Sequence, residues 1–130
     1  MATTEALSVS LDNAELLMHN RIEIRKVSLD TVTAALVTFP LGSSWAEDSQ
    51  PFRGTHSCPL PHVGYMIEGA MGVRMDDGSV AVFEQGDVFL LPPGHDAWPE
   101  HDAPCTFVEF SQGSDYYDDI VASYEPRLLE

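Results

Sequence analysis

The sequence predicts an all-β protein: a small antiparallel double-sheet barrel with an N-terminal arm and a short C-terminal helix or tail. Several short segments alternate apolar and polar residues with the period of two that strands show. Turn-forming Gly, Pro and Asp residues separate these segments at short intervals. The chain has 130 residues, 44% of them hydrophobic, with nine Gly and nine Pro, and this composition suits one compact domain rich in turns.

The first strands are expected after an N-terminal arm. Residues 1–20 carry a weak amphipathic pattern, and we expect them to pack on the body of the protein or on a second subunit. From Arg21 the pattern changes, because RIEIRKV alternates apolar and charged residues and TVTAALVTF is apolar and β-branched. These two segments predict a pair of strands with Asp30 in the turn between them.

A polar, turn-rich loop at residues 41–54 follows and carries Trp45 and Phe52 toward the next histidines. Five further strands are expected, separated by EGA, DDG, QGD and PPG: HVGYMIE, MGVRMD, SVAVFE, DVFLLP and CTFVEF. Beyond Phe110 the alternation is lost. We therefore divide the chain into an arm (1–20), a barrel (21–113) and an acidic C-terminal helix or tail (114–130).

The charge of the chain excludes some partners. Six Lys and Arg stand against 21 Asp and Glu, a formal net charge of -15 that repels phosphate backbones and anionic lipid headgroups. We expect no nucleic-acid partner and no membrane association. With no apolar run of about 20 residues and no signal-peptide pattern, a cytoplasmic location is expected. In that compartment the two cysteines are expected to be thiols, or one of them a metal ligand.

Residues able to bind a transition metal are concentrated in two runs. GTHSCPLPHVGYMIEG (54–69) and QGDVFLLPPGHDAWPEH (85–101) together hold four of the five histidines, and the first run also holds Cys58. Histidine and cysteine are the preferred ligands of borderline-soft metals, so this clustering is the main reason to expect a metal site.

The spacing within these runs resembles the two sequence motifs of the cupin superfamily, small β-barrels that commonly hold one metal ion. The first motif has the form G-x5-H-x-H-x3-E-x6-G and the second G-x5-P-x-G-x2-H-x3-N. The H, H, E and G places of the first motif hold His56, Cys58, His62 and Gly69. The G, P and G places of the second hold Gly86, Pro92 and Gly94.

Several motif places hold other residues. Gln50 stands at the first glycine place, Ala97 at the last histidine place and His101 at the asparagine place. Cys58 replaces a histidine and His62 replaces the glutamate, so two imidazoles and one thiolate keep the single negative charge of the usual set. The resemblance covers roughly residues 45–110 and implies the fold more firmly than the metal.

We expect His56, Cys58, His62 and His95 to be the metal ligands. Side chains at i and i+2 of a strand point the same way, which gives His56 and Cys58 chelating geometry. His95 and His101 both keep the facing of Ala97, and His95 is nearer to it. Each residue alone also has a structural interpretation as a wall histidine or a small core side chain. A His/Cys set favours zinc, with iron, nickel or copper as alternatives.

The barrel interior is expected to form an apolar, aromatic pocket for a flat organic molecule, and its expected lining includes Trp45, Met66, Phe89, Trp98 and Phe107. Candidates for proton transfer are His101, Glu109 and Tyr65, although a surface position for Glu109 is an equal alternative. Cys105 is expected in the core.

Two functions remain open from the sequence. The resemblance implies a metal-dependent small-molecule enzyme, with a Lewis-acid site for cyclisation or isomerisation of a carbonyl-rich aromatic or polyketide-like substrate. The alternatives are a non-catalytic small-ligand or metal-binding module, and a dioxygenase if the metal is iron. We also expect a homodimer, with the strand at 21–27 and the preceding arm as an edge covered by a second copy.

Overall fold

The computed structural model of the protein describes residues 5–30, 32–49 and 62–112. Two short turns, η1 (Leu11–Asn13) and η2 (Trp45–Ser49), accompany the strands in these ranges. The strands are β1 (Leu16–His19), β2 (Ile22–Leu29), β3 (Val32–Phe39), β4 (His62–Glu68), β5 (Met71–Met75), β6 (Val80–Phe83), β7 (Val88–Leu91), β8 (His95–Pro99) and β9 (Cys105–Gln112). The C-terminal helix or tail expected at 114–130 lies outside the described residues.

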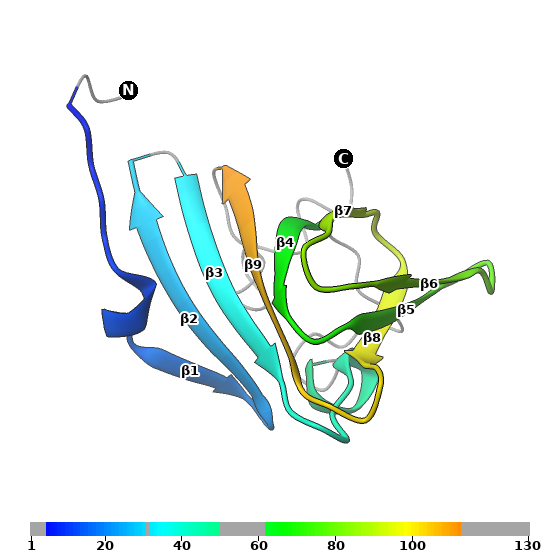
Figure 1. Ribbon diagram of the computed structural model, residues 1–130. Helices are drawn as coiled ribbons and strands as arrows, with labels where there is room; N and C mark the ends of the chain where they lie inside the picture. Colours follow the sequence, from blue (N-terminus) through cyan, green and yellow to red (C-terminus); the bar gives the residue numbers. More distant parts are fainter. Residues whose placement is uncertain (1–4, 31, 50–61, 113–130) are drawn as a thin grey trace.

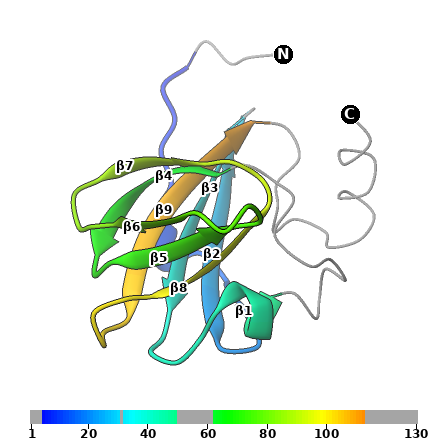
Figure 2. The ribbon, with the colours of Figure 1, turned by 90° about the vertical axis from the view of Figure 1, so that its right-hand side faces the viewer.

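The strands form two antiparallel sheets. The larger sheet has the order β1-β2-β3-β9-β4-β7 and the smaller has the order β6-β5-β8. Figure 2 shows the smaller sheet in front of the larger one, so that the two form the layers of a double-sheet barrel. The predicted all-β, double-sheet architecture is confirmed. None of the described helical segments is long and apolar enough to cross a membrane.

Two local features differ from the sequence pattern. Within the region interpreted as an arm, residues 16–19 form β1, which pairs with β2 from Leu16↔Arg25 to His19↔Ile22. Because β1 and β3 flank β2, the interpretation of the 21–27 segment as an exposed edge is wrong. The second difference is β8, which the alternation pattern did not predict as a strand because its sequence is short, follows two prolines and ends at Pro99.

The core lies between the sheets and follows the alternation of the strands. In β3 the inward side chains are Ala35, Val37 and Phe39, and their partners across β9 are Glu109, Phe107 and Cys105. All but one of these inward residues are apolar, as burial requires. Cys105 is fully buried, which confirms its predicted core position, and burial raises the pKa of its thiol to about 12.

A buried carboxylate joins η2 to the turn after β1. Asp48 has no exposed surface and accepts hydrogen bonds from Arg21 Nε at 2.8 Å, Asn20 Nδ2 at 2.8 Å and Ser44 N at 2.9 Å. Burial alone would raise the pKa of Asp48, but the hydrogen bonds from Arg21 and Ser44 together hold it below its ordinary value. This contact fixes the segment that carries Trp45 into the core.

Replacing this carboxylate is expected to destabilise the fold in a pH-dependent way. Asp48→Asn places an amide against donors and lowers the free energy of unfolding by about 2–4 kcal/mol at pH 7, measured by chemical denaturation. The pKa of Asp48 in the folded protein lies below the ordinary value of 3.8. The stabilisation by the Asp48 carboxylate is therefore fully present above pH 3.8 and is lost as the pH falls through the lowered pKa. The difference between variant and wild type therefore narrows below that pH. The control is Asp102→Asn in an exposed turn, which is expected to change the free energy of unfolding little. Equal losses of unfolding free energy in the two variants would contradict this account.

Candidate functional site

Two histidines face each other between the sheets. His62 begins β4 of the larger sheet, His95 begins β8 of the smaller sheet, and both side chains are buried. Their ring centroids lie 5.2 Å apart with the planes at 69°, an edge-to-face arrangement. Of the four histidine and cysteine residues predicted as metal ligands, these two are in the described part of the chain, and the fold brings them together.

The proton of His95 is placed by a backbone turn. His95 Nδ1 lies 2.7 Å from the carbonyl oxygen of Pro92. A carbonyl oxygen only accepts hydrogen bonds, so Nδ1 must donate, and Nε2 of the neutral ring then holds the lone pair. Gly94, at a φ of 87°, allows the tight turn that returns the chain to this carbonyl.

A carboxylate holds the other histidine in the same way. His62 Nδ1 is hydrogen-bonded to Glu109 Oε2. An ionised carboxylate can only accept, so this contact also favours a proton on Nδ1 and a lone pair on Nε2. Glu109 itself is 7% exposed, and its other oxygen, Oε1, has no hydrogen-bond partner among the described residues. The surface position that the sequence left open for Glu109 is therefore not the one observed.

Sheet register explains how these two side chains meet. Glu109 on β9 lies opposite Ala35 of β3 on one side and Gly64 of β4 on the other. His62 is two residues before Gly64 and shares its inward facing, so it is the diagonal neighbour of Glu109. The small residues on both sides leave room for the carboxylate to reach the imidazole.

The two imidazoles close one side of an apolar pocket whose enclosed volume is about 20 Å³. A cavity of this size holds about one water molecule, so only a single atom or small group could sit beside the rings without a rearrangement of the wall. The described lining residues are Phe39, Trp45, His62, Met71, Phe89, Leu91, His95 and Phe107.

Sequence reasoning identified part of this wall. Trp45, Phe89 and Phe107 line the pocket, whereas Met66 is fully buried on β4 but does not reach it. Trp98 lies on the opposite face of β8 from His95, where its Nε1 donates to Glu100 Oε2 at 2.6 Å. Met71, which the facing of its strand also predicts for the wall, lines the pocket. Sequence reasoning missed Phe39 and Leu91, although the alternation of their strands carried the signal.

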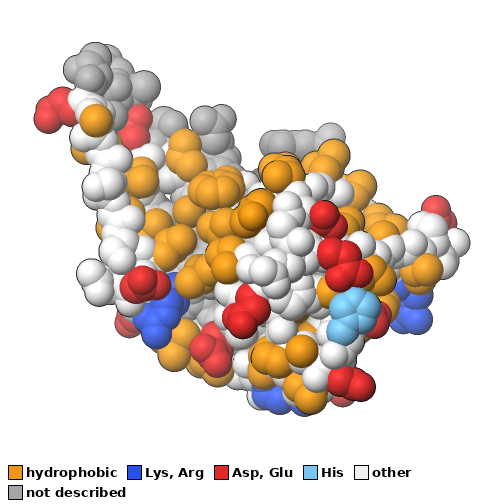
Figure 3. All heavy atoms as spheres, viewed as in Figure 1, with side chains coloured by type: hydrophobic (Ala, Val, Ile, Leu, Met, Phe, Trp, Pro, Cys, Tyr) orange, Lys and Arg blue, Asp and Glu red, His pale blue; other side chains and the backbone are white. Residues whose placement is uncertain are grey.

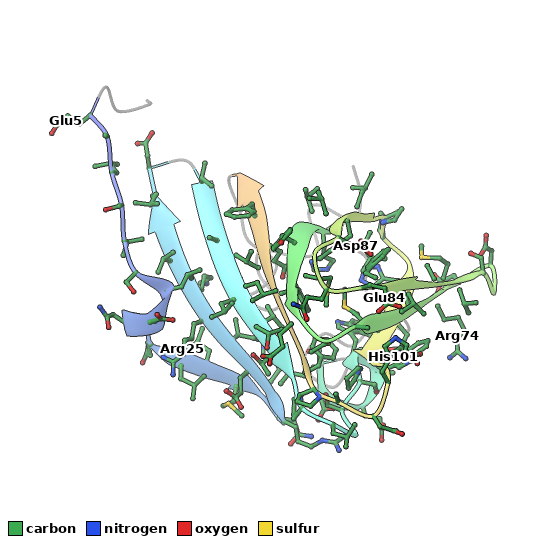
Figure 4. All side chains as sticks on the ribbon, viewed as in Figure 1. Glu5, Arg25, Arg74, Glu84, Asp87 and His101 are labelled. Atoms are coloured by element: carbon green, nitrogen blue, oxygen red, sulfur yellow. The ribbon has the colours of Figure 1, made fainter. Side chains whose placement is uncertain are left out.

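Two of the predicted proton-transfer residues lie away from the pocket. Tyr65 is three residues from His62 on the same strand, so it faces outward, and it is 43% exposed. His101 is in the turn between β8 and β9 at a φ of 59°, with Nε2 at 3.2 Å from Glu84 Oε2. Figure 4 shows His101 and Glu84 side by side at the surface. Glu109 is the predicted proton-transfer residue that the fold brings to the histidines.

Solved structures share this architecture at low sequence identity. An RmlC-like cupin from Shewanella frigidimarina superposes with a TM-score of 0.59 at 19% identity, covering 88% of this chain and 96% of its own. KdgF from a Halomonas species gives 0.60 at 18% identity, with 86% and 97% covered. The polyketide cyclase RemF from Streptomyces resistomycificus gives 0.59 at 17% identity, with 83% and 80% covered.

The chain has the cupin fold. No protein-family model matches the sequence, and comparison with curated proteins finds no similar sequence. The similarity to cupins is therefore found in the fold and in the spacing of the turn glycines and proline. Most of the other motif places hold different residues. At these identities the similarity establishes the fold and leaves the activity to be argued from the site.

The donors of this site fit a borderline-soft divalent ion in part. The described residues contain no group of three His, Cys, Asp or Glu side chains arranged to hold a metal. They do contain two neighbouring imidazoles, each with Nδ1 engaged, as ligating histidines commonly are. The other expected ligands, His56 and Cys58, lie outside the described residues.

The glycine beside Glu109 should be hard to replace. A Cβ on Gly64 would lie 2.3 Å from the carbonyl oxygen of Val108 and 2.8 Å from Cζ of Phe89. The first of these atoms is backbone and cannot move alone, so Gly64→Ala is expected to cost about 2 kcal/mol or more of unfolding free energy. Urea denaturation measures this, with exposed Arg74→Ala as control. A Gly64→Ala variant as stable as the control would contradict the packing described here.

Proposed function

We propose that this cupin is a metal-dependent small-molecule enzyme in which His62 and His95 supply two of the metal ligands. The observation that carries the proposal is the buried pair of imidazoles at 5.2 Å, each with its Nδ1 proton engaged. Two unrelated partners, a carboxylate and a backbone carbonyl, leave both Nε2 atoms as the lone-pair nitrogens. Metal binding needs a lone pair on one nitrogen of each ring, and this arrangement supplies it at Nε2, whereas a packing role for the rings would not need it.

The remaining ligands in the proposal are His56 and Cys58. With one thiolate and three imidazoles, including His95, the set suits zinc first, and iron, nickel or copper are alternatives. A divalent metal held there would act as a Lewis acid toward a carbonyl oxygen.

The chain's own residues limit what could react at this site. The wall around the imidazoles is aromatic and aliphatic, so it excludes water and favours an uncharged, flat group. Because the enclosed space is small, a substrate would bring one polar group to the histidines while the rest of it stays nearer the mouth. We therefore propose a cyclase or isomerase acting on a carbonyl-rich aromatic or polyketide-like substrate, and the shared fold of the polyketide cyclase RemF supports this choice.

A second candidate is a binding module without turnover, and the small enclosed volume favours it. In that case the metal would stabilise the barrel or hold a ligand by one group. If the bound metal is iron, the function that we propose is that of a dioxygenase.

Metal content separates these functions. His62→Ala is expected to lower the zinc bound per chain by more than tenfold while the barrel stays folded, because the ion would bind a preformed wall. Elemental analysis of purified protein measures the metal and circular dichroism measures the fold. His101→Ala, which removes an exposed histidine, is the matched control and keeps its metal. Unchanged occupancy in His62→Ala would refute the ligand assignment, and loss of the fold would indicate a structural metal.

A second copy of the chain is the partner that we propose for the outer face of the larger sheet. The outward positions of β4, β7 and β9 hold one charged residue, Glu68 at the end of β4, and paired apolar residues form continuous rows, Leu90–Val63–Phe110 and Val88–Tyr65–Val108. Figure 3 shows hydrophobic side chains gathered over this sheet, with acidic side chains at the margins of the patch. The most exposed members are Val63, Tyr65, Ile67, Val88, Leu90 and Phe110, at 43–77% exposure.

Charge favours an identical partner at this face, where Glu68 at the end of β4 is the one charged outward residue of β4, β7 and β9. Two copies with a net charge of -15 repel each other, and this repulsion is weakest where apolar side chains of both copies meet. The six side chains expose on the order of 500 Å² of apolar surface, near the upper end of patches found on monomers, and flanking residues would complete a standard interface.

A pair of matched substitutions tests this dimer. Val88→Asp places a charge in the patch and is expected to convert a dimer to a monomer, measured by sedimentation velocity. Val80→Asp is the control, because Val80 is similarly exposed, 70% against 77%, but lies on the smaller sheet. A monomeric wild type, or a dimer that survives Val88→Asp, would contradict the proposal.

A further inference from the structure

The contact between Glu109 and His62 assigns a role to a carboxylate that lies inside an apolar core. We infer that Glu109 is a positioning residue, which fixes the proton of His62 on Nδ1 so that Nε2 is the nitrogen available to the metal. The inference rests on the proposed function, because it concerns the metal site proposed there. It differs from the expectation that Glu109 transfers a proton to or from the substrate.

The burial of Glu109 requires an explanation. Moving a carboxylate from water into an apolar interior costs several kcal/mol unless partners compensate for the loss of hydration. Within the described residues Glu109 forms no ion pair with Lys or Arg; its partner is His62, and Oε1 has none. A carboxylate kept there at such a cost is explained if positive charge develops behind the imidazole, as it does when a cation binds to Nε2.

The sheet is built to allow this contact. The neighbours of Glu109 across β9 are Ala35 and Gly64, so neither adjacent strand places a large side chain against the carboxylate. The diagonal position of His62 then puts its Nδ1 edge, rather than its Nε2 edge, at Oε2. The contact thus selects one tautomer through geometry set by the backbone.

His95 provides an internal comparison. Its Nδ1 donates to the backbone oxygen of Pro92, which no substitution at position 109 removes. The tautomer of His62 should therefore depend on residue 109, while that of His95 should not. If Glu109 only filled space beside His62, replacing it would not produce this difference between two rings 5.2 Å apart.

Two variants separate hydrogen bonding from charge. Glu109→Gln keeps an oxygen that can accept from Nδ1, and Glu109→Leu keeps the approximate volume but has no acceptor. Imidazole ¹⁵N NMR of the metal-free protein at pH 8, where an ordinary histidine is neutral, reports which nitrogen carries the proton. Zinc affinity is measured in parallel by competition with a chelator. If Glu109→Leu fails to fold, Glu109→Met, which is flexible enough to fill the same space, replaces it.

We expect both histidines of the wild type, and of Glu109→Gln, to carry the proton on Nδ1. In Glu109→Leu, His62 loses its preference for a proton on Nδ1, whereas His95 keeps it. The zinc affinity of Glu109→Leu falls by about 10–100-fold, and that of Glu109→Gln changes by about threefold or less. An unchanged His62 tautomer in Glu109→Leu overturns the inference, and so does a Glu109→Gln variant that behaves like Glu109→Leu. If the wild type binds no zinc, the proposed function is wrong. The NMR measurement still tests whether Glu109 fixes the tautomer of His62.

Discussion

The site depends on a hydrogen bond between two polar side chains that are buried inside an apolar layer. His62 and Glu109 belong to adjacent central strands of the larger sheet, and their hydrogen bond crosses the inner face of that sheet. Removing His62 would leave the carboxylate of Glu109 buried with no hydrogen-bond partner among the described residues. The small neighbours Ala35 and Gly64 leave room for this pair, and Phe89 lies close to Gly64.

Much of the fold could be predicted from the sequence because its signals are local. The alternation of apolar and polar residues predicts the strands, and Gly and Pro residues predict the turns between them. The same turn residues keep the spacing of the cupin motifs. Motif spacing placed His62 among the expected metal ligands and His95 near the position that Ala97 occupies in the motif. These are relations between residues a few positions apart, and short-range geometry determines them.

The contacts that define the site depend on long-range register, which alternation does not reveal. His62 and Glu109 are 47 residues apart, and their meeting depends on how β4 aligns with β9. Trp98 and Tyr65 are a different case, because local spacing already placed them. Trp98 is three residues after His95 and Tyr65 is three residues after His62, so each lies on the opposite face of its strand from that histidine. For Tyr65 that signal was present and was outweighed by the chemical suitability of a phenol.

The central claim is that Nε2 of His62 and Nε2 of His95 bind the same metal ion. The most direct measurement is anomalous diffraction at the zinc absorption edge from crystals grown with zinc. The account predicts one peak about 2.0–2.1 Å from both Nε2 atoms, the ordinary zinc–imidazole distance. A peak bound to only one of the two rings, or none between the sheets, would contradict it.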